Sequence, residues 1–238
     1  MMVLFFILNE IVVRTSPNRQ ISKTRPSRQA YLRDFKNFLL ANTFGFFFAI
    51  LLQIFLSQKG WLKAYNNPET YGWSYYYFSI FLVIIFHDIY FYLFHRLFHH
   101  PLLYRFHRIH HESRVISPLS SVAFHPLEAF FVYSFISIFL LVFPLHTDVI
   151  VAYSWVIALV TVHGHSGVVH VPKFMMRGKW ARAVVTSYHH SLHHKYPNCN
   201  FGLYFNFMDR IFETEHPYLL KSSEEFADSI SSKKSGQT

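Results

Sequence analysis

The sequence predicts an all-α integral membrane protein, with about four transmembrane helices in two hairpins and a cytoplasmic helical cap that is rich in histidine. Hydrophobic residues make up 52% of the 238-residue chain and aromatic residues 20%, whereas charged residues make up only 15%. Long apolar runs alternate with polar segments. The basic residues and the histidines gather in those polar segments, and their distribution indicates that they share one side of a membrane.

The net charge and the cysteine count exclude several classes of protein. The net charge of +9 would suit a nucleic-acid-binding protein, but the basic residues flank apolar runs, which favours contact with anionic lipid headgroups. A single cysteine, Cys199, excludes an internal disulfide and a thiolate-rich metal site. Any metal that the histidines bind must therefore have nitrogen ligands.

The N-terminal 37 residues form a basic lead-in. The opening run MMVLFFILNEIVV lacks a leading positive charge and contains Asn9 and Glu10, so we interpret it as a short interfacial segment rather than a cleaved signal peptide.

The first expected hairpin joins the runs 38–56 and 75–94 through a polar loop, 57–72. Each run is long enough to cross a hydrocarbon core about 30 Å thick.

The second expected hairpin begins at Pro126, a residue that suits the first turn of a helix, and its first helix reaches Phe143, where Pro144 ends it. We expect Asp148 to cap the next helix, which reaches His165. Helices of about 18 residues are about 27 Å long, slightly short for a full span, and we interpret both as crossing the membrane.

The basic residues predict the orientation. Those before the first run are Arg14, Arg19, Lys23, Arg25, Arg28, Arg33 and Lys36. Those after the second and fourth runs are Arg96, Arg105, Arg108, Arg114, Lys173, Arg177, Lys179, Arg182 and Lys195. The loop between the first two runs has only Lys59 and Lys63. By the positive-inside rule, both termini and the histidine-rich segments are cytoplasmic, at the endoplasmic reticulum in a eukaryote or the inner membrane in a bacterium.

The chain thus divides into the lead-in 1–37, a membrane-embedded domain 38–216 and a polar tail 217–238, which we expect to be disordered or a loose helix.

The histidines form the strongest pattern in the sequence. Of the 17 histidines, all but His216 lie between His87 and His194. Three groups have helical i, i+3 or i, i+4 spacing, which places imidazoles on one helix face. These are His95 and His99; His107, His110 and His111; and His190, His193 and His194. Eight or nine nitrogen ligands exceed what one ion takes, so we expect a dimetal site of iron, zinc, copper or nickel in the cap.

Other histidines and several carboxylates have less certain roles. We interpret His87, His100, His146, His163, His170, His189 and His216 as hydrogen-bonded structural residues. His125 is equally consistent with a ligand and with a residue that lines the pocket. Asp88 lies within an apolar run, where an ionisable side chain is costly, so we expect it to orient a ligand. Glu128 and Asp209 are similar candidates, although each could cap a helix or pair with an arginine.

The motifs HDIYFYLFHRLFHHPLLYRFHRIHH, FHPLEAF, HSGVVHVP, YHHSLHHKYPNCNFG and MDRIFET resemble those of the fatty acid hydroxylase/sterol desaturase superfamily. The resemblance covers about residues 70–216. AFHPLEAF followed by FPLH is most similar to sterol C-5 desaturases, and HSG with HHSLHH also resembles methyl-sterol oxidases.

The resemblance implies a non-haem di-iron oxidase that uses dioxygen and NAD(P)H-derived electrons, delivered by a cytochrome b-type or another electron-donor protein, to attack a C–H bond of a lipid. It implies that the three histidine groups are iron ligands and adds His165, which precedes SG. Asn200 and Gly202 match the motif after the last group. Met208 and Glu213 depart from the family pattern W-D-x-x-F-G-T, and His189 leaves the register of the last group open by one residue.

The favoured function is therefore desaturation or hydroxylation of a sterol, with fatty acid or sphingolipid hydroxylation as the alternative. A metal transporter is disfavoured because most of the apolar runs contain few ionisable residues near mid-membrane. A zinc hydrolase is disfavoured because the sequence lacks the patterns H-E-x-x-H and G-x-S-x-G.

Overall fold

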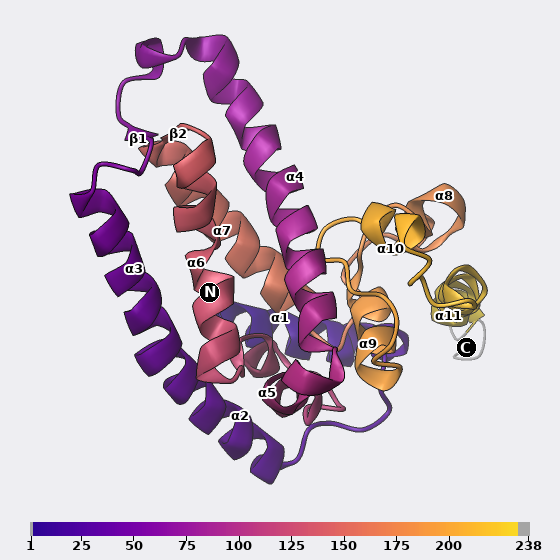
Figure 1. Ribbon diagram of the computed structural model, residues 1–238. Helices are drawn as coiled ribbons and strands as arrows, with labels where there is room; N and C mark the ends of the chain where they lie inside the picture. The colour runs from indigo at the N-terminus through magenta and orange to yellow at the C-terminus, as the bar shows by residue number, and fades with distance from the viewer. Residues whose placement is uncertain (1, 233–238) are drawn as a thin grey trace.

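The computed structural model describes residues 2–232 and is mostly helical (Figure 1). The α-helices are α1 (Met2–Thr15), α2 (Arg28–Leu40), α3 (Phe47–Gln58), α4 (Trp73–Phe98), α5 (Pro101–His111), α6 (Pro126–Val142), α7 (Thr147–Gly164), α8 (Gly178–Ala181), α9 (Ser187–Lys195), α10 (Phe207–Ile211) and α11 (Leu219–Ser232). The strands are β1 (Ala64–Tyr65) and β2 (Leu145–His146). Short 3-10 segments cover Pro17–Arg19, Pro68–Thr70, Pro118–Val122 and Lys173–Met176.

Within residues 2–232, three helices are long and apolar enough to cross a membrane. The first spans Arg28–Gln58, where α2 continues through a π-helical turn, Ala41–Phe46, into α3. It begins ten residues before the run predicted from the sequence, because Ser27 caps it by accepting a hydrogen bond from the amide of Ala30. The others are α4 and α7, while α6 is apolar but shorter, at 17 residues.

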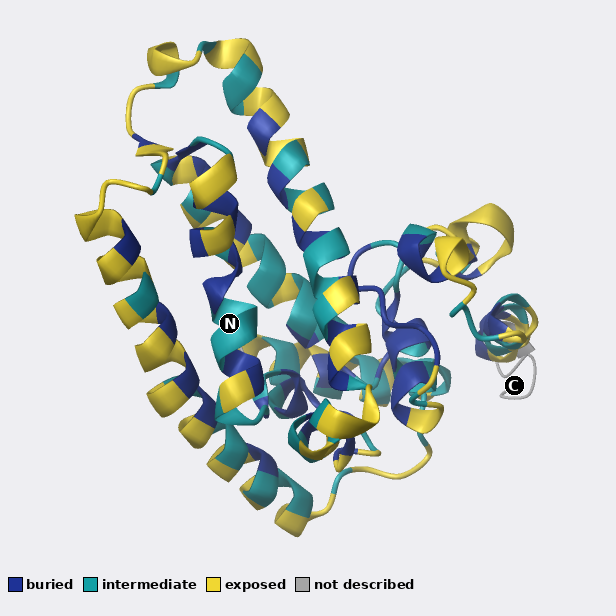
Figure 2. Ribbon diagram, viewed as in Figure 1, coloured by how far each residue is buried: buried dark blue, intermediate teal, exposed yellow. Residues whose placement is uncertain are grey.

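The outer faces of these helices are exposed, as the yellow segments of Figure 2 show, and many of the exposed residues are apolar. Exposed large side chains include Phe44, Phe47, Phe48, Leu51 and Phe55 on the first helix, Phe78, Phe81, Leu93 and Leu97 on α4, and Val151, Trp155 and Leu159 on α7. A contiguous apolar surface of this extent is typical of contact with lipid.

A buried apolar core joins α4, α6 and α7. Its centre contains Val83, Phe135, Leu140, Val149 and Tyr153. The first helix approaches α6 at Gly45, where an added Cβ would lie 2.5 Å from the Ala129 Cβ and 2.7 Å from the Pro126 carbonyl oxygen. Only glycine permits this backbone approach.

The two hairpins are joined by a β pair that the all-α prediction does not contain. Ala64 pairs with Leu145 and Tyr65 with His146, in parallel register. His146 also caps α7, because its Nδ1 accepts a hydrogen bond from the amide of Asp148. The prediction that Asp148 itself caps this helix is therefore wrong.

The short helices gather near the lower end and to one side of the long ones, with α5 at the lower end of α4 in Figure 1, α9 to the right of it, and α8, α10 and α11 further to the right. The polar tail contains α11, whose Ala227 and Ile230 pack against Val169 and Met176. A folded helix thus occupies most of the segment expected to be disordered or loosely helical, and residues 233–238 lie outside the described residues.

Candidate metal centre

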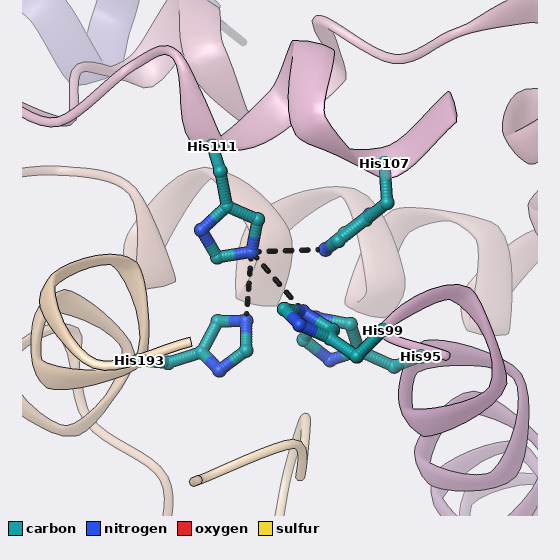
Figure 3. Close-up of side chains that lie close together, drawn as sticks. All are labelled: His95, His99, His107, His111 and His193. Atoms are coloured by element: carbon teal, nitrogen blue, oxygen red, sulfur yellow. Dashed lines mark hydrogen bonds between the residues drawn. The ribbon is translucent and has the colours of Figure 1, made fainter. Parts of the chain in front are cut away.

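The structure brings the nine predicted histidines together in two clusters. The five-histidine cluster contains His95, His99, His107, His111 and His193 (Figure 3). The four-histidine cluster contains His110, His165, His190 and His194. Within each cluster the ligating atoms all lie within 4.8 Å of one another. The clusters are neighbours, with the ring centroids of His111 and His194 4.7 Å apart.

Helix geometry explains how the histidine doublets divide between the clusters. Consecutive residues on an α-helix point about 100° apart, whereas residues four apart share a face. On α5, His107 and His111 belong to the five-histidine cluster and His110 to the other. On α9, His190 and His194 belong to the four-histidine cluster and His193 to the other. Each short helix therefore serves both clusters.

The Nδ1 atoms of four cluster histidines face oxygen atoms that can accept a hydrogen bond. His107 Nδ1 lies 2.7 Å from Glu128 Oε1. The other acceptors are backbone carbonyls, at 2.9 Å from Phe201 to His95, 2.6 Å from Cys199 to His193 and 3.1 Å from Thr161 to His165. Because a carbonyl oxygen only accepts and a neutral imidazole has one N–H group, the proton of His95, His193 and His165 must be on Nδ1 and the lone pair on Nε2. An ionised Glu128 fixes the tautomer of His107 in the same way.

The Nε2 atoms converge at distances that favour a bound cation. His111 Nε2 lies 3.1 Å from His99 Nε2, 3.0 Å from His107 Nε2 and 3.1 Å from His193 Nε2. His165 Nε2 lies 3.1 Å from the Nε2 atoms of His110 and His190 and 3.2 Å from that of His194.

Lone pairs at this separation repel unless a cation lies between them. Nitrogen ligands about 2.0–2.1 Å from one ion lie roughly 3 Å apart, so the two clusters fit a metal ion each.

Burial keeps these imidazoles neutral at neutral pH. It lowers the pKa of His111 to about 3 and that of His165 to about 4. The pKa values of His107, His193 and His194 are well below the usual value, because of burial first and neighbouring imidazoles second. A neutral imidazole is the form that binds a metal, so the protein holds these ligands ready for metal binding.

Two buried carboxylates accept hydrogen bonds from the loop after α9 rather than from a histidine. Asp88 Oδ1 accepts a hydrogen bond from the amide of Tyr204 at 2.8 Å. Asp209 accepts from the amides of Phe201 and Gly202, each at 2.8 Å. The same loop supplies the carbonyls that orient His95 and His193, so both carboxylates support the five-histidine cluster through the loop. Of the predicted orienting carboxylates, Glu128 alone contacts a cluster histidine directly.

Asn200 lies in the same loop with a left-handed backbone conformation, at φ 60°. Its Oδ1 accepts a hydrogen bond from the amide of His216 at 2.8 Å. This contact anchors the segment after α10, and it does not involve a cluster histidine.

The remaining histidines lie outside the clusters. His125 caps α6 by accepting a hydrogen bond from the amide of Leu127. It belongs to neither cluster, so the structure does not support the first of its two predicted roles, that of a metal ligand. His87 Nδ1 lies 2.9 Å from the Tyr204 hydroxyl, a structural contact as expected. His163 lines the apolar cavity described below. His189 is buried outside both clusters, so the structure places His190, and not His189, in the cluster register. Neither ring nitrogen of His189 has a hydrogen-bond partner among the described residues, so the prediction that it is a hydrogen-bonded structural residue is wrong.

The two departures from the family motif have different structural settings. Met208, which replaces a tryptophan, is buried against Tyr92 and Phe201 and keeps an apolar contact there. Glu213, which replaces a glycine, has φ 55°. Glycine is the residue that this conformation favours, so the departure imposes strain on the backbone.

Two cavities of opposite character reach the clusters. The first is apolar and borders His95, His107, His110, His165 and His190, with Phe91, Phe94, Phe98, Phe124 and Phe131 among its other lining residues. The second is a polar cleft of about 1040 Å³ that reaches His111 and His194. Its basic residues are Lys23, Arg25, Arg33, Arg108, Arg114 and Lys195. The clusters therefore lie between an apolar cavity and a cleft lined by basic residues.

Sequence reasoning did not identify the backbone carbonyls of Cys199, Phe201 and Thr161 as partners of cluster histidines. A carbonyl is common to every residue, so side-chain identity carries no signal for this role. The signal that exists is indirect, in the tight NCNFG loop directly after the last histidines.

Comparison with known proteins agrees with this arrangement. The model of the family described as fatty acid hydroxylase matches residues 80–214, more than half of the chain. The Delta(7)-sterol 5(6)-desaturase ERG3B of Gibberella zeae is 32% identical over 163 residues, which cover 67% of this chain and 49% of that protein.

Two further relatives show similar identity. The lathosterol oxidase of Homo sapiens is 33% identical over 66% of this chain and 52% of that protein. The Delta(7)-sterol 5(6)-desaturase erg32 of Schizosaccharomyces pombe is 33% identical over 66% and 46%. The chain thus spans about half the length of these relatives. No solved structure shows a significant match.

The matched residues 80–214 include all nine histidines of the two clusters and the loop that orients two of them. The chain therefore belongs to the fatty acid hydroxylase family.

Proposed function

We propose that the chain is a membrane-bound, non-haem di-iron oxidoreductase that uses dioxygen and NAD(P)H-derived electrons to desaturate or hydroxylate a lipid, with a sterol as the favoured substrate and C-5 as the favoured position. The observation that carries the proposal is the pair of adjacent, buried clusters of neutral imidazoles at the edge of an apolar cavity.

In this proposal, the nine cluster histidines hold the two metal ions. Iron bound there would supply the redox chemistry that activates dioxygen toward a C–H bond. Glu128 and the carbonyls of Phe201, Cys199 and Thr161 hold the Nδ1 protons of their histidines and so keep the Nε2 lone pairs directed at the metals. The overall desaturation consumes one dioxygen, two electrons and two protons, removes two hydrogens from the lipid and releases two waters.

The apolar cavity is the proposed position of the substrate. Its phenylalanines exclude water from the reacting carbon, which protects an oxidising centre from side reactions. The cavity measures about 60 Å³. Small-molecule sites usually measure about 300–1,000 Å³, so a lipid has to displace lining side chains such as Phe91 and Phe131 as it enters.

The proposed topology has four spans, with both termini and the histidine cap on the cytoplasmic side. It is supported by the three long apolar helices, by the apolar helix α6 and by the basic residues around the cap. An electron donor, of cytochrome b type in our proposal, would approach from that side.

The sterol assignment rests on the names of the relatives, two of which are Delta(7)-sterol 5(6)-desaturases and one a lathosterol oxidase. The alternative, fatty acid or sphingolipid hydroxylation, rests on the family description. Both use the same metals and cavity and differ only in the lipid that enters.

The first test is the metal content of the detergent-purified protein after iron-replete expression, with a Mössbauer spectrum. We expect about two coupled irons per chain in the wild type and their loss in His110→Ala. His216→Ala is the matched control, because His216 lies outside both clusters and should leave the iron content unchanged.

Zinc alone, or metal below stoichiometry, in the wild type would contradict the di-iron proposal and would favour a zinc-binding or metal-transporting membrane protein. With iron present, turnover of a Δ7-sterol against that of a fatty acyl lipid separates the two substrate classes.

A further inference from the structure

The N-terminal segment, outside the family match of residues 80–214, contacts the loop that carries His165. Asn9 is the centre of this contact. It is a buried amide on α1, a helix that is otherwise rich in apolar residues. Its Nδ2 donates a hydrogen bond to the carbonyl of Ser166, directly after His165, at 2.6 Å. Its Oδ1 accepts from His170 Nε2 at 2.7 Å. Both the nitrogen and the oxygen of the Asn9 side-chain amide therefore form hydrogen bonds with the same loop.

A second contact lies ten residues further along the chain. Gln20 and Val168 form an antiparallel β-bridge. The amide of Ile21 donates to the Gly167 carbonyl at 3.0 Å, and the amide of Val169 donates to the Arg19 carbonyl at 2.9 Å. The Arg19 guanidinium adds two hydrogen bonds, to the carbonyls of Val169 and Val171.

The loop itself has little freedom. Gly167 has φ +70°, and an added Cβ would lie 2.9 Å from the Ile116 carbonyl oxygen. Ser187, at the start of α9, donates to the Val168 carbonyl at 2.8 Å. The loop therefore connects the N-terminal segment both to His165 and to the helix that carries His190 and His194.

These contacts lie on one side of one cluster. His165, His190 and His194 are all members of the four-histidine cluster, together with His110. The long-range hydrogen bonds of Asn9 and of Arg19–Ile21 go to residues 166–171 and not to the loop 199–205, which supports the five-histidine cluster. The N-terminal segment is thus placed to act on one metal site selectively.

We propose that residues 9–21 form a brace for the four-histidine cluster, and that Asn9 is a positioning residue for His165. The inference rests on the proposed metal site and extends it to a segment outside the family match. The brace holds the Ser166 carbonyl, and through it the backbone of His165, so that the His165 Nε2 stays directed at the other three imidazoles.

The test uses cobalt(II), whose visible spectrum reports the geometry of its ligands, and the rate at which a chelator removes it from the detergent-purified full chain. Substitution of an outer-shell residue that supports a metal ligand typically lowers metal affinity 10–100-fold. We expect Asn9→Ala to release one of two cobalt ions about 10-fold faster and to change the visible bands of that ion, while the other ion leaves at the wild-type rate.

A second variant identifies the affected site. His190→Ala weakens the four-histidine cluster and leaves the five-histidine cluster as the main site. In this background Asn9→Ala should have no further effect on release of the remaining ion, since coupled residues are non-additive. Glu10→Gln is the matched control, because Glu10 is the next residue on α1 and pairs with exposed Arg14 and Arg25. It should release both ions as the wild type does.

Arg19→Met keeps the test decisive if Asn9→Ala does not fold. It removes the two guanidinium hydrogen bonds but leaves the backbone pairing of Gln20 with Val168, and it should accelerate release of the same ion. Unchanged release in both variants, or equal acceleration of both ions, overturns the brace alone. Wild-type protein that binds no stoichiometric cobalt overturns the metal site and the brace together.

Discussion

The Nδ1 of His107 lies 2.7 Å from the Oε1 of Glu128, and both side chains are buried. This contact joins α5 to the first turn of α6, so a helix of the cap is tied to an apolar helix at the ligand itself. The carboxylate fixes the proton on Nδ1 and makes Nε2 the more basic ligand atom.

Glu128→Ala is expected to lower the metal affinity of the five-histidine cluster about 10–100-fold, because His107 loses the group that fixes its tautomer. Glu128→Gln should retain part of the affinity, since its amide oxygen can accept the same hydrogen bond. Competition with a chelator of known affinity measures the effect. Glu69→Ala, at an exposed position distant in sequence, is the control, and an equal loss in that variant would contradict the prediction.

Asp209→Asn is expected to destabilise the protein by about 2 kcal/mol, because hydrogen bonds to a charged acceptor are worth about 1.5–3 kcal/mol each. The substitution weakens the contacts with the amides of Phe201 and Gly202 that hold the loop. Denaturant unfolding in detergent measures it. Asp228→Asn removes an exposed ion pair with Arg177 and should change stability little. An equal loss of stability in the two variants would contradict the prediction, because the loop contacts would then stabilise the protein no more than the exposed ion pair does.

Glu213→Gly is expected to stabilise the protein by up to about 1 kcal/mol. A left-handed backbone conformation costs a non-glycine residue roughly 1–2 kcal/mol, part of which the flexibility of glycine in the unfolded chain cancels. The Glu213 side chain is exposed, so little packing is lost. Asn200→Gly, at φ 60°, should instead destabilise because it removes the hydrogen bond to the His216 amide. A rise in unfolding temperature for the first variant and a fall for the second is the expected pair of results.

Metal-free protein is expected to lose stability as the pH falls from about 6.5 to about 4. Burial lowers the pKa of His165 to about 4 and that of His189 to about 3, from a usual value of 6.5. In this range the unfolded chain binds protons that the folded chain excludes, so acid favours unfolding, whereas above about 6.5 both states are neutral at these residues.

The unfolding temperature of chelator-treated protein between about pH 4.5 and pH 8 tests this dependence. His189→Leu should reduce the slope, since it removes one buried histidine outside the clusters. A flat profile would contradict the prediction.

The histidine groups were predictable because their spacing is local. Residues four apart on a helix share a face whatever surrounds them, so the pairing of His107 with His111 and of His190 with His194 follows from the sequence. The partition into two clusters was not predictable in the same way. His99 and His193 meet through the packing of α4 against the loop after α9, and no local pattern encodes that contact.

Other features depend on contacts between distant segments. The pairing of Tyr65 with His146 involves two residues of each strand, too few to produce an alternating pattern. The tail helix α11 is polar overall, and its stability depends on Ala227 and Ile230 finding Val169 and Met176. Asn9 was visible, beside Glu10, as a polar residue in an apolar run, but its partners at Ser166 and His170 follow only from the fold.

The division of α9 between the two clusters also sets an order of assembly. His193 follows His111 by 82 residues, and His190 and His194 come from the same late helix. At a synthesis rate of about 5–20 residues per second, α5 leaves the ribosome on the order of ten seconds before α9 does. Neither histidine cluster can be completed during that interval, so any metal that binds there must reach a chain whose apolar helices are already made.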